Sequence, residues 1–398
     1  MTEPPRAQGP LDGIRVLDLT RLLPGGYATL LMADLGADVV KIEEPGKGDY
    51  IRWTPPVVGD FSSGHIALNR NKRSVTLNLK SDGGRDLFAR LVEHFDIVIE
   101  SFRPGVMERL GLGWSALAAI NPRLVYCAIS GYGQDGPRAQ VAGHDANYIG
   151  YAGVLGIIGE AGSRPVLPGV QIGDLAGGGM AAVIAILAAL NQRERTGRGD
   201  FCDVSMMEGA ASWLSIHAAD MVATKHVPER ELMHLSGRHP CYRIYPAADG
   251  WITVGALEPQ FWAALCTAIG REDLAGDAFA EGERRTEVIG ELEKLFATKT
   301  RAGWMATFEG LDVCVGPVND MAEAFDDAQL RYREMFVDDE IEGVGPWTHV
   351  GNPIKLAGAP GDVTRRPPPA MGEHTAEVLA EVGIAPDDLE GLRSTGVI

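Results

Sequence analysis

The sequence predicts an α/β protein with a mostly parallel, doubly wound sheet in a large domain and a smaller α+β domain beside it. Two observations lead to this fold class. Short apolar runs alternate with helical segments from Ile14 to Ser130, which is the pattern of successive βαβ units. Much later, Ala248-Asp249-Gly250 separates two apolar runs between Cys241 and Leu257, and this pattern favours an antiparallel hairpin.

The elements of the large domain follow from apolar runs that end at glycine, proline or polar residues. Ligands of doubly wound sheets bind beyond the carboxyl ends of the strands, so we expect a site there. Neither GxGxxG nor GxxxxGK[ST] occurs at these ends, so the Rossmann-like sheet carries no fingerprint of a dinucleotide or P-loop nucleotide. The expected strands are 14–20, 38–43, 74–79, 96–100 and 124–130, and the expected helices are 27–37, 83–93, 114–120 and 180–191.

The small domain opens on the hairpin, and Glu258-Pro259 begins its first helix with proline in the first turn. The chain of 398 residues is long enough for two domains. We expect a large domain over 1–212, a linker over 213–238, a small α+β domain over 239–320, a return linker over 321–344, and the last part of the large domain over 345–398.

The charge balance narrows the choice of partners. The net charge is −18 and the isoelectric point is about 4.9, so nucleic acid and anionic membranes would be repelled. The five cysteines lack metal-type spacing, which favours reduced thiols and no metal site. The N-terminus lacks a signal-peptide pattern, and no uninterrupted apolar run has the length of a membrane span. We therefore expect a cytoplasmic protein.

Asp174 and the three glycines that follow it form the first candidate site. They precede the apolar helix of 180–191, so we expect Asp174 near the N-cap and Gly177–Gly179 in the first turn. Free N–H groups at such a helix start attract an anion or a developing oxyanion. A single aspartate before a helix is more often only a cap, but three glycines indicate that the backbone comes close to something else.

Two further candidates follow strand ends. Arg103 and Arg109, with Phe102, come after the expected strand 96–100 and suit a phosphorylated, aromatic ligand, although solvated arginines would give the same pattern. His144 lies in a loop after another strand. A single histidine is more often structural, but loops at this edge commonly carry sites.

Taken together, these blocks resemble the family III CoA-transferase (CaiB/BaiF) superfamily and, within it, the α-methylacyl-CoA racemases. The resemblance implies an interlocked homodimer whose ligand is an acyl-CoA thioester, with coenzyme A as part of the substrate and no tightly bound cofactor. It covers nearly the whole chain through LDGIRVLDLT, LMADLGADVVKIE, NRNKRSVTLNLKSDGG, ESFRPGVMERLGLG, NPRLVYCAISGYGQDGP, AGHDANY, GDLAGGGM and VGALEPQFW.

The resemblance also implies which residues hold coenzyme A. Many relatives carry an arginine where this chain has Glu44, so one expected phosphate contact is missing or supplied elsewhere. The positions that match the family's CoA contacts are Leu77, Leu79, Ser101, Phe102, Arg103 and Arg109, with Gly177 and Gly178 at the helix start.

The racemase resemblance assigns the chemistry to His144, Asp174 and Glu258. Inverting a carbon beside a thioester requires removal of its proton on one face and return on the other. We expect His144 and Asp174 to be the acid/base pair, Glu258 to orient His144, and the glycine N–H groups to hold the enolate oxygen. Asp145 is more consistent with a structural role.

Two other hypotheses remain open. In the transferases of the family, the aspartate matching Asp174 is a nucleophile, and the position matching His144 is usually aromatic. A non-catalytic acyl-CoA-binding protein would not need His144, Asp174 and Glu258 together. The acyl group itself is not determined, because fatty, bile-acid-like and aryl-propionyl groups all fit.

Overall fold

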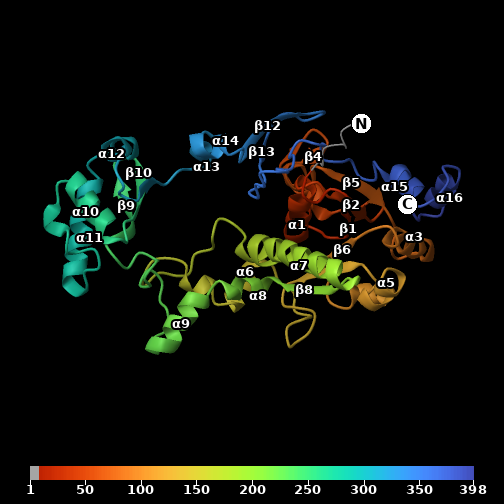
Figure 1. Ribbon diagram of the computed structural model, residues 1–398, viewed down its shortest axis with the longest axis horizontal. Coiled ribbons are helices and arrows are strands. Elements are labelled where there is room, and N and C mark those ends of the chain that lie inside the picture. The colour runs from red at the N-terminus through yellow and green to blue at the C-terminus, as the bar shows by residue number, and fades with distance from the viewer. Residues whose placement is uncertain (1–8) are drawn as a thin grey trace. The chain divides into compact units, whose positions relative to one another are not determined.

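A computed structural model describes residues 9–398 and divides them into two compact units (Figure 1). The larger unit contains the described residues up to Val154 together with Pro168–Trp213 and Ala328–Ile398, and the smaller unit contains Leu155–Leu167 and Leu214–Asp327. Part of the expected linker 213–238 is a helix, α9 (Ser215–Thr224), which belongs to the smaller unit. The proline-rich start of the chain lies outside the described residues.

The larger unit is built on a six-stranded sheet in the order β5-β2-β1-β6-β7-β8. All neighbouring strands pair in parallel, which confirms the predicted fold class. The sequence analysis missed β8, an edge strand whose central Asp203 is exposed and interrupts the apolar pattern. The strands are β1 (Arg15–Asp18), β2 (Asp38–Glu43), β5 (Lys72–Thr76), β6 (Ile97–Glu100), β7 (Val125–Ser130) and β8 (Phe201–Ser205).

The strand order reverses between β1 and β6, which lie side by side with Val16 opposite Ile97. At such a switch point the chain leaves the two strands in opposite directions, and a crevice opens outside their carboxyl ends. The segments that border this crevice are therefore 19–22 after β1 and 101–103 after β6.

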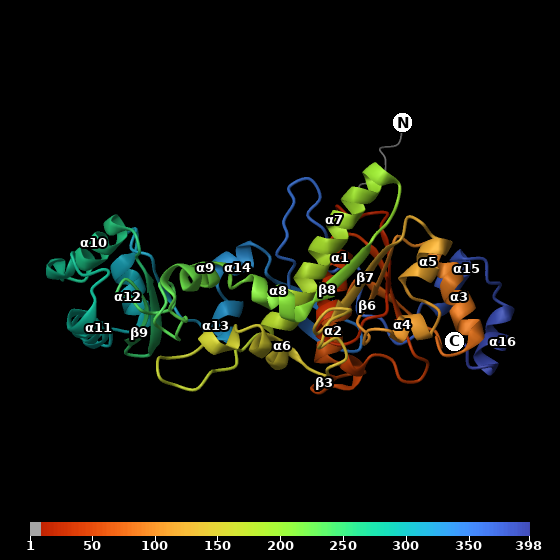
Figure 2. The ribbon, with the colours of Figure 1, turned by 90° about the horizontal axis from the view of Figure 1, so that it is seen from below.

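Helices cover both faces of the sheet (Figures 1 and 2). Side chains alternate along a strand, so Val16 of β1 packs against α1 and α7, while Leu17 packs on the opposite face with α3, α5 and α15. These helices are α1 (Leu23–Asp34), α7 (Ala181–Thr196), α3 (Asp82–Val92), α5 (Trp114–Ile120) and α15 (Thr375–Glu381).

The C-terminal part of the chain returns to the larger unit. The backbone N–H of Asn78 donates to the carbonyl of Val397 over 2.8 Å, and α16 (Asp388–Ser394) supplies Leu389 to the core beside α3. A hairpin of β12 (Phe336–Ile341) and β13 (Gly345–Val350) lies where the sequence analysis expected a linker up to residue 344. The remaining elements of this unit are η1 (Tyr50–Trp53), β3 (Val57–Val58), β4 (Phe61–Ser62), α2 (Ser63–Asn69), α4 (Val106–Arg109), α6 (Asp145–Tyr151), α8 (Met206–Ser212) and α14 (Ala328–Tyr332).

The helix after Asp174 begins earlier than predicted. A π-helical segment, η3 (Ile172–Met180), leads directly into α7, and its N-cap is Gln171. The prediction that Asp174 caps the helix is therefore wrong. A Cβ on Gly177 would lie 2.7 Å from the carbonyl oxygen of Met206, so the glycines let η3 pack closely against α8, and the wider π turn accommodates that contact.

Within the described residues, one continuous helical stretch, Ile172–Thr196, is long and apolar enough to cross a membrane by length and composition. Ala182, Val183 and Ile186 of this stretch are buried in the core of the larger unit, as expected for the core helix of an α/β sheet. The stretch is thus weak evidence for a membrane span, and the cytoplasmic location stays a prediction.

The smaller unit contains a three-stranded antiparallel sheet in the order β11-β10-β9. The predicted hairpin is present, with Ala247 opposite Gly250, and the predicted helix begins at Pro259. Three helices bury Tyr245, Ile252 and Trp262 against one face of the sheet. The elements are β9 (Tyr242–Ala247), β10 (Gly250–Gly255), β11 (Val315–Pro317), α10 (Pro259–Ala268), α11 (Gly282–Phe296), α12 (Arg301–Phe308) and α13 (Met321–Phe325), with short turns at η2 (Leu155–Ile157) and η4 (Glu272–Leu274).

Candidate functional site

Two adjoining cavities lie in the larger unit at the carboxyl ends of the parallel strands. Arg21 and Phe102, which follow β1 and β6, line both of them. We call the first the basic cavity, with a volume of about 370 Å³, and the second the His144 cavity, with about 340 Å³. Both are therefore located at the switch point of the sheet, where the strand order predicts a ligand.

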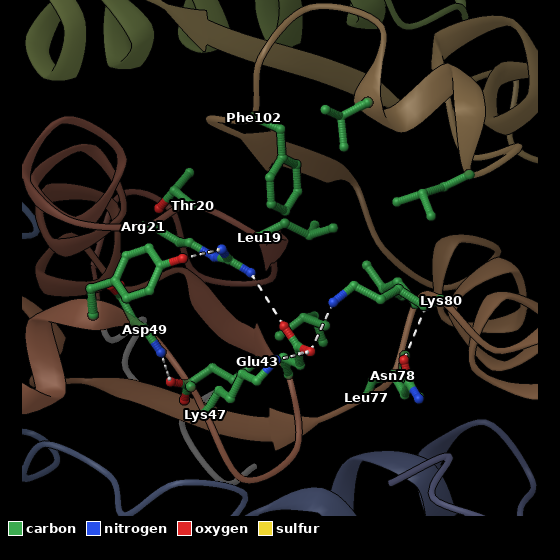
Figure 3. A pocket seen from close by; sticks show the side chains of 17 residues that line it. Leu19, Thr20, Arg21, Glu43, Lys47, Asp49, Leu77, Asn78, Lys80 and Phe102 are labelled. Atoms are coloured by element: carbon green, nitrogen blue, oxygen red, sulfur yellow. Dashed lines mark hydrogen bonds and ion pairs between the residues drawn. The ribbon is translucent and has the colours of Figure 1, made fainter. Parts of the chain in front are cut away.

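The basic cavity is lined by residues at or after the carboxyl ends of β1, β2, β5 and β6 (Figure 3). Apolar side chains form part of its wall, and three cationic side chains reach into it. The lining residues are Leu19, Thr20, Arg21, Ile42, Glu43, Glu44, Lys47, Gly48, Asp49, Tyr50, Leu77, Asn78, Leu79, Lys80, Phe102, Val106 and Leu110.

The acids Glu43 and Asp49 in this wall are neutralised by buried cations. Arg52 donates to both carboxylate oxygens of Glu43, at 2.7 and 2.6 Å, and Lys41 lies 2.9 Å from the carboxylate of Asp49. Burial alone would raise the pKa of Glu43, but its hydrogen bonds and its cationic neighbours outweigh burial and lower the pKa to about 2. Glu43 is thus ionised near neutral pH.

Arg21 was not identified from the sequence, although it stands just beyond the predicted first strand. Its guanidinium lies 5.3 Å from the centre of the Tyr50 ring and 5.4 Å from that of Phe102, within cation–π range of both. Its backbone N–H donates to Ser101 over 3.1 Å. A cationic residue directly after the first strand was the signal that could have revealed it.

The structure separates the predicted CoA contacts into three groups. Leu77, Leu79 and Phe102 line the basic cavity, whereas Ser101, Phe102 and Arg103 line the His144 cavity. Arg109 is exposed and lines neither cavity, and its guanidinium lies 3.2 Å from the position of a Cβ on Gly105. Whether Arg103 and Arg109 together hold a phosphorylated ligand stays a prediction.

Gly177 and Gly178 are buried and line neither cavity. A Cβ on Gly178 would lie 2.8 Å from the side chain of Met206 and 3.2 Å from that of Pro24. Their predicted role in holding an enolate oxygen stays a prediction, and helix packing accounts for both glycines without it.

His144 is held by its backbone while its side chain remains exposed. It is the N-cap of α6, and its N–H donates to the side-chain oxygen of Asn147 over 3.0 Å. The Tyr148 hydroxyl donates to the carbonyl of Gly143, and a Cβ on Gly143 would lie 2.8 Å from the Tyr148 ring. These contacts fix the chain on both sides of His144 and leave its imidazole at the cavity.

Asp174 reaches the same cavity from η3. Its backbone N–H donates to the carboxylate of Asp145 over 3.0 Å. Burial, and then the negative charge of Asp145, raise the pKa of Asp174 to about 6, and nearby His144 opposes this shift. A carboxyl group with such a pKa exchanges protons near neutrality, as acid/base catalysis requires.

The full lining of the His144 cavity joins the ends of β1, β6 and β7 to α6, η3 and α8. It consists of Arg21, Leu22, Pro24, Ser101, Phe102, Arg103, Pro104, Ile129, Ser130, Gly131, Ala139, Val141, Ala142, Gly143, His144, Tyr148, Asp174 and Met206. The sequence analysis did not select Tyr148, although it lies within the AGHDANY block.

Glu258 belongs to the smaller unit, where it is the exposed N-cap of α10. Its backbone carbonyl accepts the N–H groups of Phe261 and Trp262 at 3.0 and 3.1 Å. The predicted pairing of Glu258 with His144 stays a prediction. In residues 9–398, no group of three or more His, Cys, Asp or Glu side chains is arranged to hold a metal ion.

Known proteins resemble this chain over nearly its full length. Human succinyl-CoA:glutarate CoA-transferase is 35% identical over 397 residues, covering 98% of this chain and 90% of that protein. Human alpha-methylacyl-CoA racemase is 36% identical over 391 residues, covering 98% and 97%.

The crystal structure of a CAIB/BAIF family protein from Brucella suis superimposes with a TM-score of 0.82 at 33% identity, covering 94% of this chain and all of that one. The sequence profile described as CoA-transferase family III matches residues 11–375. On the strength of this match, the chain belongs to CoA-transferase family III, whose members include both CoA-transferases and alpha-methylacyl-CoA racemases.

Proposed function

We propose that this protein is an acyl-CoA racemase that interconverts the two configurations at the 2-position of 2-methyl-branched acyl-CoA thioesters. One observation carries the proposal: His144 and Asp174 line the same cavity although they come from two different elements, α6 and η3. Racemisation at a thioester α-carbon needs two groups that exchange protons with it from different sides.

In the proposed reaction, one of the two side chains removes the α-proton as a base. The electron pair of the broken C–H bond moves into the thioester carbonyl and forms an enolate. The other side chain then returns a proton to the opposite face, and the roles are reversed for the other enantiomer. The pKa of about 6 for Asp174 supports this assignment, because both of its protonation states are accessible near neutral pH.

The basic cavity supports coenzyme A as part of the substrate. Its cationic side chains suit phosphate groups, and its apolar wall suits the less polar portions of the ligand. It adjoins the His144 cavity through Arg21 and Phe102, so a CoA moiety bound in the first would direct its thioester toward the second. No tightly bound cofactor is needed for this chemistry.

The second candidate is a CoA-transferase, and the names of the relatives support it better than the racemase. At least six relatives named as transferases match this chain at 34–36% identity, and at least two named as racemases match it at 35–36%. Asp174 would then attack the thioester carbonyl, and the CoA thiolate would leave to give an aspartyl–acyl anhydride. The thiolate would next attack the aspartyl carbonyl, which releases the first acid and leaves an aspartyl–CoA thioester. A second carboxylate would attack this thioester and expel the thiolate, giving a second anhydride, and the thiolate would then attack the new acyl carbonyl to form the product thioester and free Asp174.

Incubation of a 2-methylacyl-CoA with the protein in D₂O distinguishes the racemase from the CoA-transferase. A racemase incorporates deuterium at the α-carbon and drives a single enantiomer to a racemic mixture. A transferase instead passes CoA to an added labelled carboxylic acid and leaves the α-hydrogen in place. Transfer of CoA without deuterium incorporation would overturn the first proposal, and a panel of acyl groups in the same assay would identify the substrate.

We also propose that two copies of the chain form the homodimer expected from the resemblance. Met180, Ile184 and Leu187 are separated by about one helical turn each, and their exposed fractions are 41%, 67% and 37%. An exposed apolar stripe on a core helix suits a second protein surface. A monomer mass in sedimentation at micromolar concentration would contradict the dimer.

A further inference from the structure

Three cations of the basic cavity converge on one carboxylate, that of Glu44. The ammonium groups of Lys80 and Lys47 lie 2.9 and 3.2 Å from the same oxygen, Oε1. The guanidinium of Arg21 lies 3.9 Å from Oε2. Arg21 follows β1, Lys47 lies in the turn after β2 and Lys80 follows β5, so the three side chains enter the cavity from different strand ends (Figure 3).

Glu44 is the carboxylate of this wall that faces the three cations, because the other acids are engaged elsewhere. Glu43 is bonded to Arg52, and Asp49 is paired with Lys41. The cavity thus has an excess of positive charge in a chain whose net charge is −18. Such a local excess attracts an anionic ligand that the rest of the surface repels.

The backbone of Glu44 is held by hydrogen bonds, whereas its side chain is partly exposed at the cavity. Its carbonyl accepts the N–H groups of Lys47 and Gly48 at 3.2 and 2.9 Å, which closes a tight turn. Its side chain is 24% exposed, and those of Lys47 and Lys80 are 71% and 69% exposed. The hydrogen bond from Lys80 holds the pKa of Glu44 below its ordinary value, so the group is a carboxylate near neutral pH.

We propose that Glu44 is a displaceable counter-ion of the ligand cavity. Its carboxylate holds the three cations together when no ligand is bound and competes with the phosphate groups of the ligand for them. Because phosphate offers more charge and more acceptor oxygens than a carboxylate, the ligand displaces Glu44. The competition weakens binding of the CoA moiety and favours its release. This inference rests on the proposed function for the identity of the ligand.

Calorimetric titration of coenzyme A into the wild type, Glu44→Gln and Glu93→Gln tests the inference. Glu93 is the exposed C-cap of α3 and lines neither cavity, so its variant makes the same change in net charge away from the site. Glu44→Gln should bind coenzyme A about tenfold more tightly, which is about 1.4 kcal/mol. Its affinity should also fall more steeply with salt. Glu93→Gln should bind as the wild type does.

Pantetheine, which carries no phosphate, serves as a second probe. Glu44→Gln should bind it no better than the wild type does, and an equal gain for pantetheine and coenzyme A would overturn the inference. Unchanged or weaker binding of coenzyme A by a folded Glu44→Gln protein, checked by thermal melting, would also overturn it. Such a result would mean that Glu44 serves only to hold the cations in place.

If the proposed function is wrong, the titrations with coenzyme A give a result that differs from a failure of the Glu44 inference. If no variant binds coenzyme A, the ligand assignment is wrong, but titration with inorganic pyrophosphate still tests the counter-ion. Glu44→Gln should then bind pyrophosphate more tightly than the wild type and Glu93→Gln do. Equal affinities of the three proteins for pyrophosphate would overturn the role of Glu44 independently of the function.

Discussion

The basic cavity and the His144 cavity share Arg21 and Phe102, but they shift the pKa of a carboxyl group in opposite directions. In the basic cavity, Glu43 has the cation Arg52 beside it, and its pKa falls to about 2. In the His144 cavity, burial and then the like charge of Asp145 raise the pKa of Asp174 to about 6. The difference indicates that the first cavity holds fixed charges for binding, whereas the second keeps a carboxyl group able to change protonation.

The largest expected effect is the loss of Asp174. Asp174→Asn keeps the shape of the side chain but cannot act as a base or as a nucleophile, so activity should fall about 10⁴-fold under either proposed function. Steady-state assay of racemisation and of CoA transfer measures it. Asp135→Asn, on an exposed loop outside the lining of both cavities, is the control and should remain active. Near-normal turnover by Asp174→Asn would remove this residue from both mechanisms.

His144→Gln separates the two functions. The substitution removes one of two proton-transfer groups, so deuterium incorporation at the α-carbon should fall about 10²- to 10³-fold. A CoA-transferase should tolerate the change far better, since His144 forms no bond in that mechanism. His94→Gln, an exposed histidine after α3, should behave as the wild type in both assays. Unaltered deuterium incorporation by His144→Gln would contradict the racemase.

Glu43→Gln tests whether the buried ion pair of Glu43 and Arg52 stabilises the wall of the basic cavity. The substitution leaves Arg52 buried beside a neutral amide, which should destabilise the fold by about 3–5 kcal/mol. Because the folded-state pKa of Glu43 is depressed to about 2, its contribution is present above the unfolded pKa and is lost as pH falls. Urea unfolding should therefore show a difference between wild type and variant that narrows from about pH 5 to pH 2. A pH-independent difference would show that charge is not the cause.

The smallest effect is expected for Asp145→Asn. Asparagine still accepts the backbone N–H of Asp174 through its side-chain oxygen, but it removes the negative charge that raises the pKa of that residue. The acid limb of kcat/KM against pH should move down by about one unit, with only a few-fold change in the plateau rate. If the plateau falls while the midpoint stays in place, Asp145 serves only to hold the backbone.

The sequence alone was enough to predict most strands of the sheet and to select the two candidate residues of the His144 cavity. Strands β1, β2, β6 and β7 overlap the strands expected from apolar runs, because parallel strands covered on both faces are rich in apolar residues. β5 overlaps its expected strand only at Ser74–Thr76, since it begins with the buried polar residues Lys72 and Arg73. His144 and Asp174 were selected from their places after a strand and before an apolar helix, and the resemblance to a known family then assigned their roles. Neither inference required knowledge of distances between distant parts of the chain.

Features that depend on packing between elements were missed or misplaced. The π turn at η3 arises where Gly177 meets the backbone of α8, and Arg109, which the sequence analysis grouped with Arg103, lines neither cavity. Strand β8 was not predicted from the sequence, because the exposed Asp203 interrupts its apolar pattern.

The sequence by itself determined the class of fold, the family and the two groups that reach the reacting carbon in the proposed mechanism. Only the tertiary structure decided that Arg21, Lys47 and Lys80 meet at Glu44 and that Asp145 lies beside Asp174. The physical reason is that burial of one face of a helix or strand requires apolar residues at regular spacing along the chain, and this spacing can be seen in the sequence. Coulombic interaction depends instead on distances in space, and these are set by how the strand ends and helices come together.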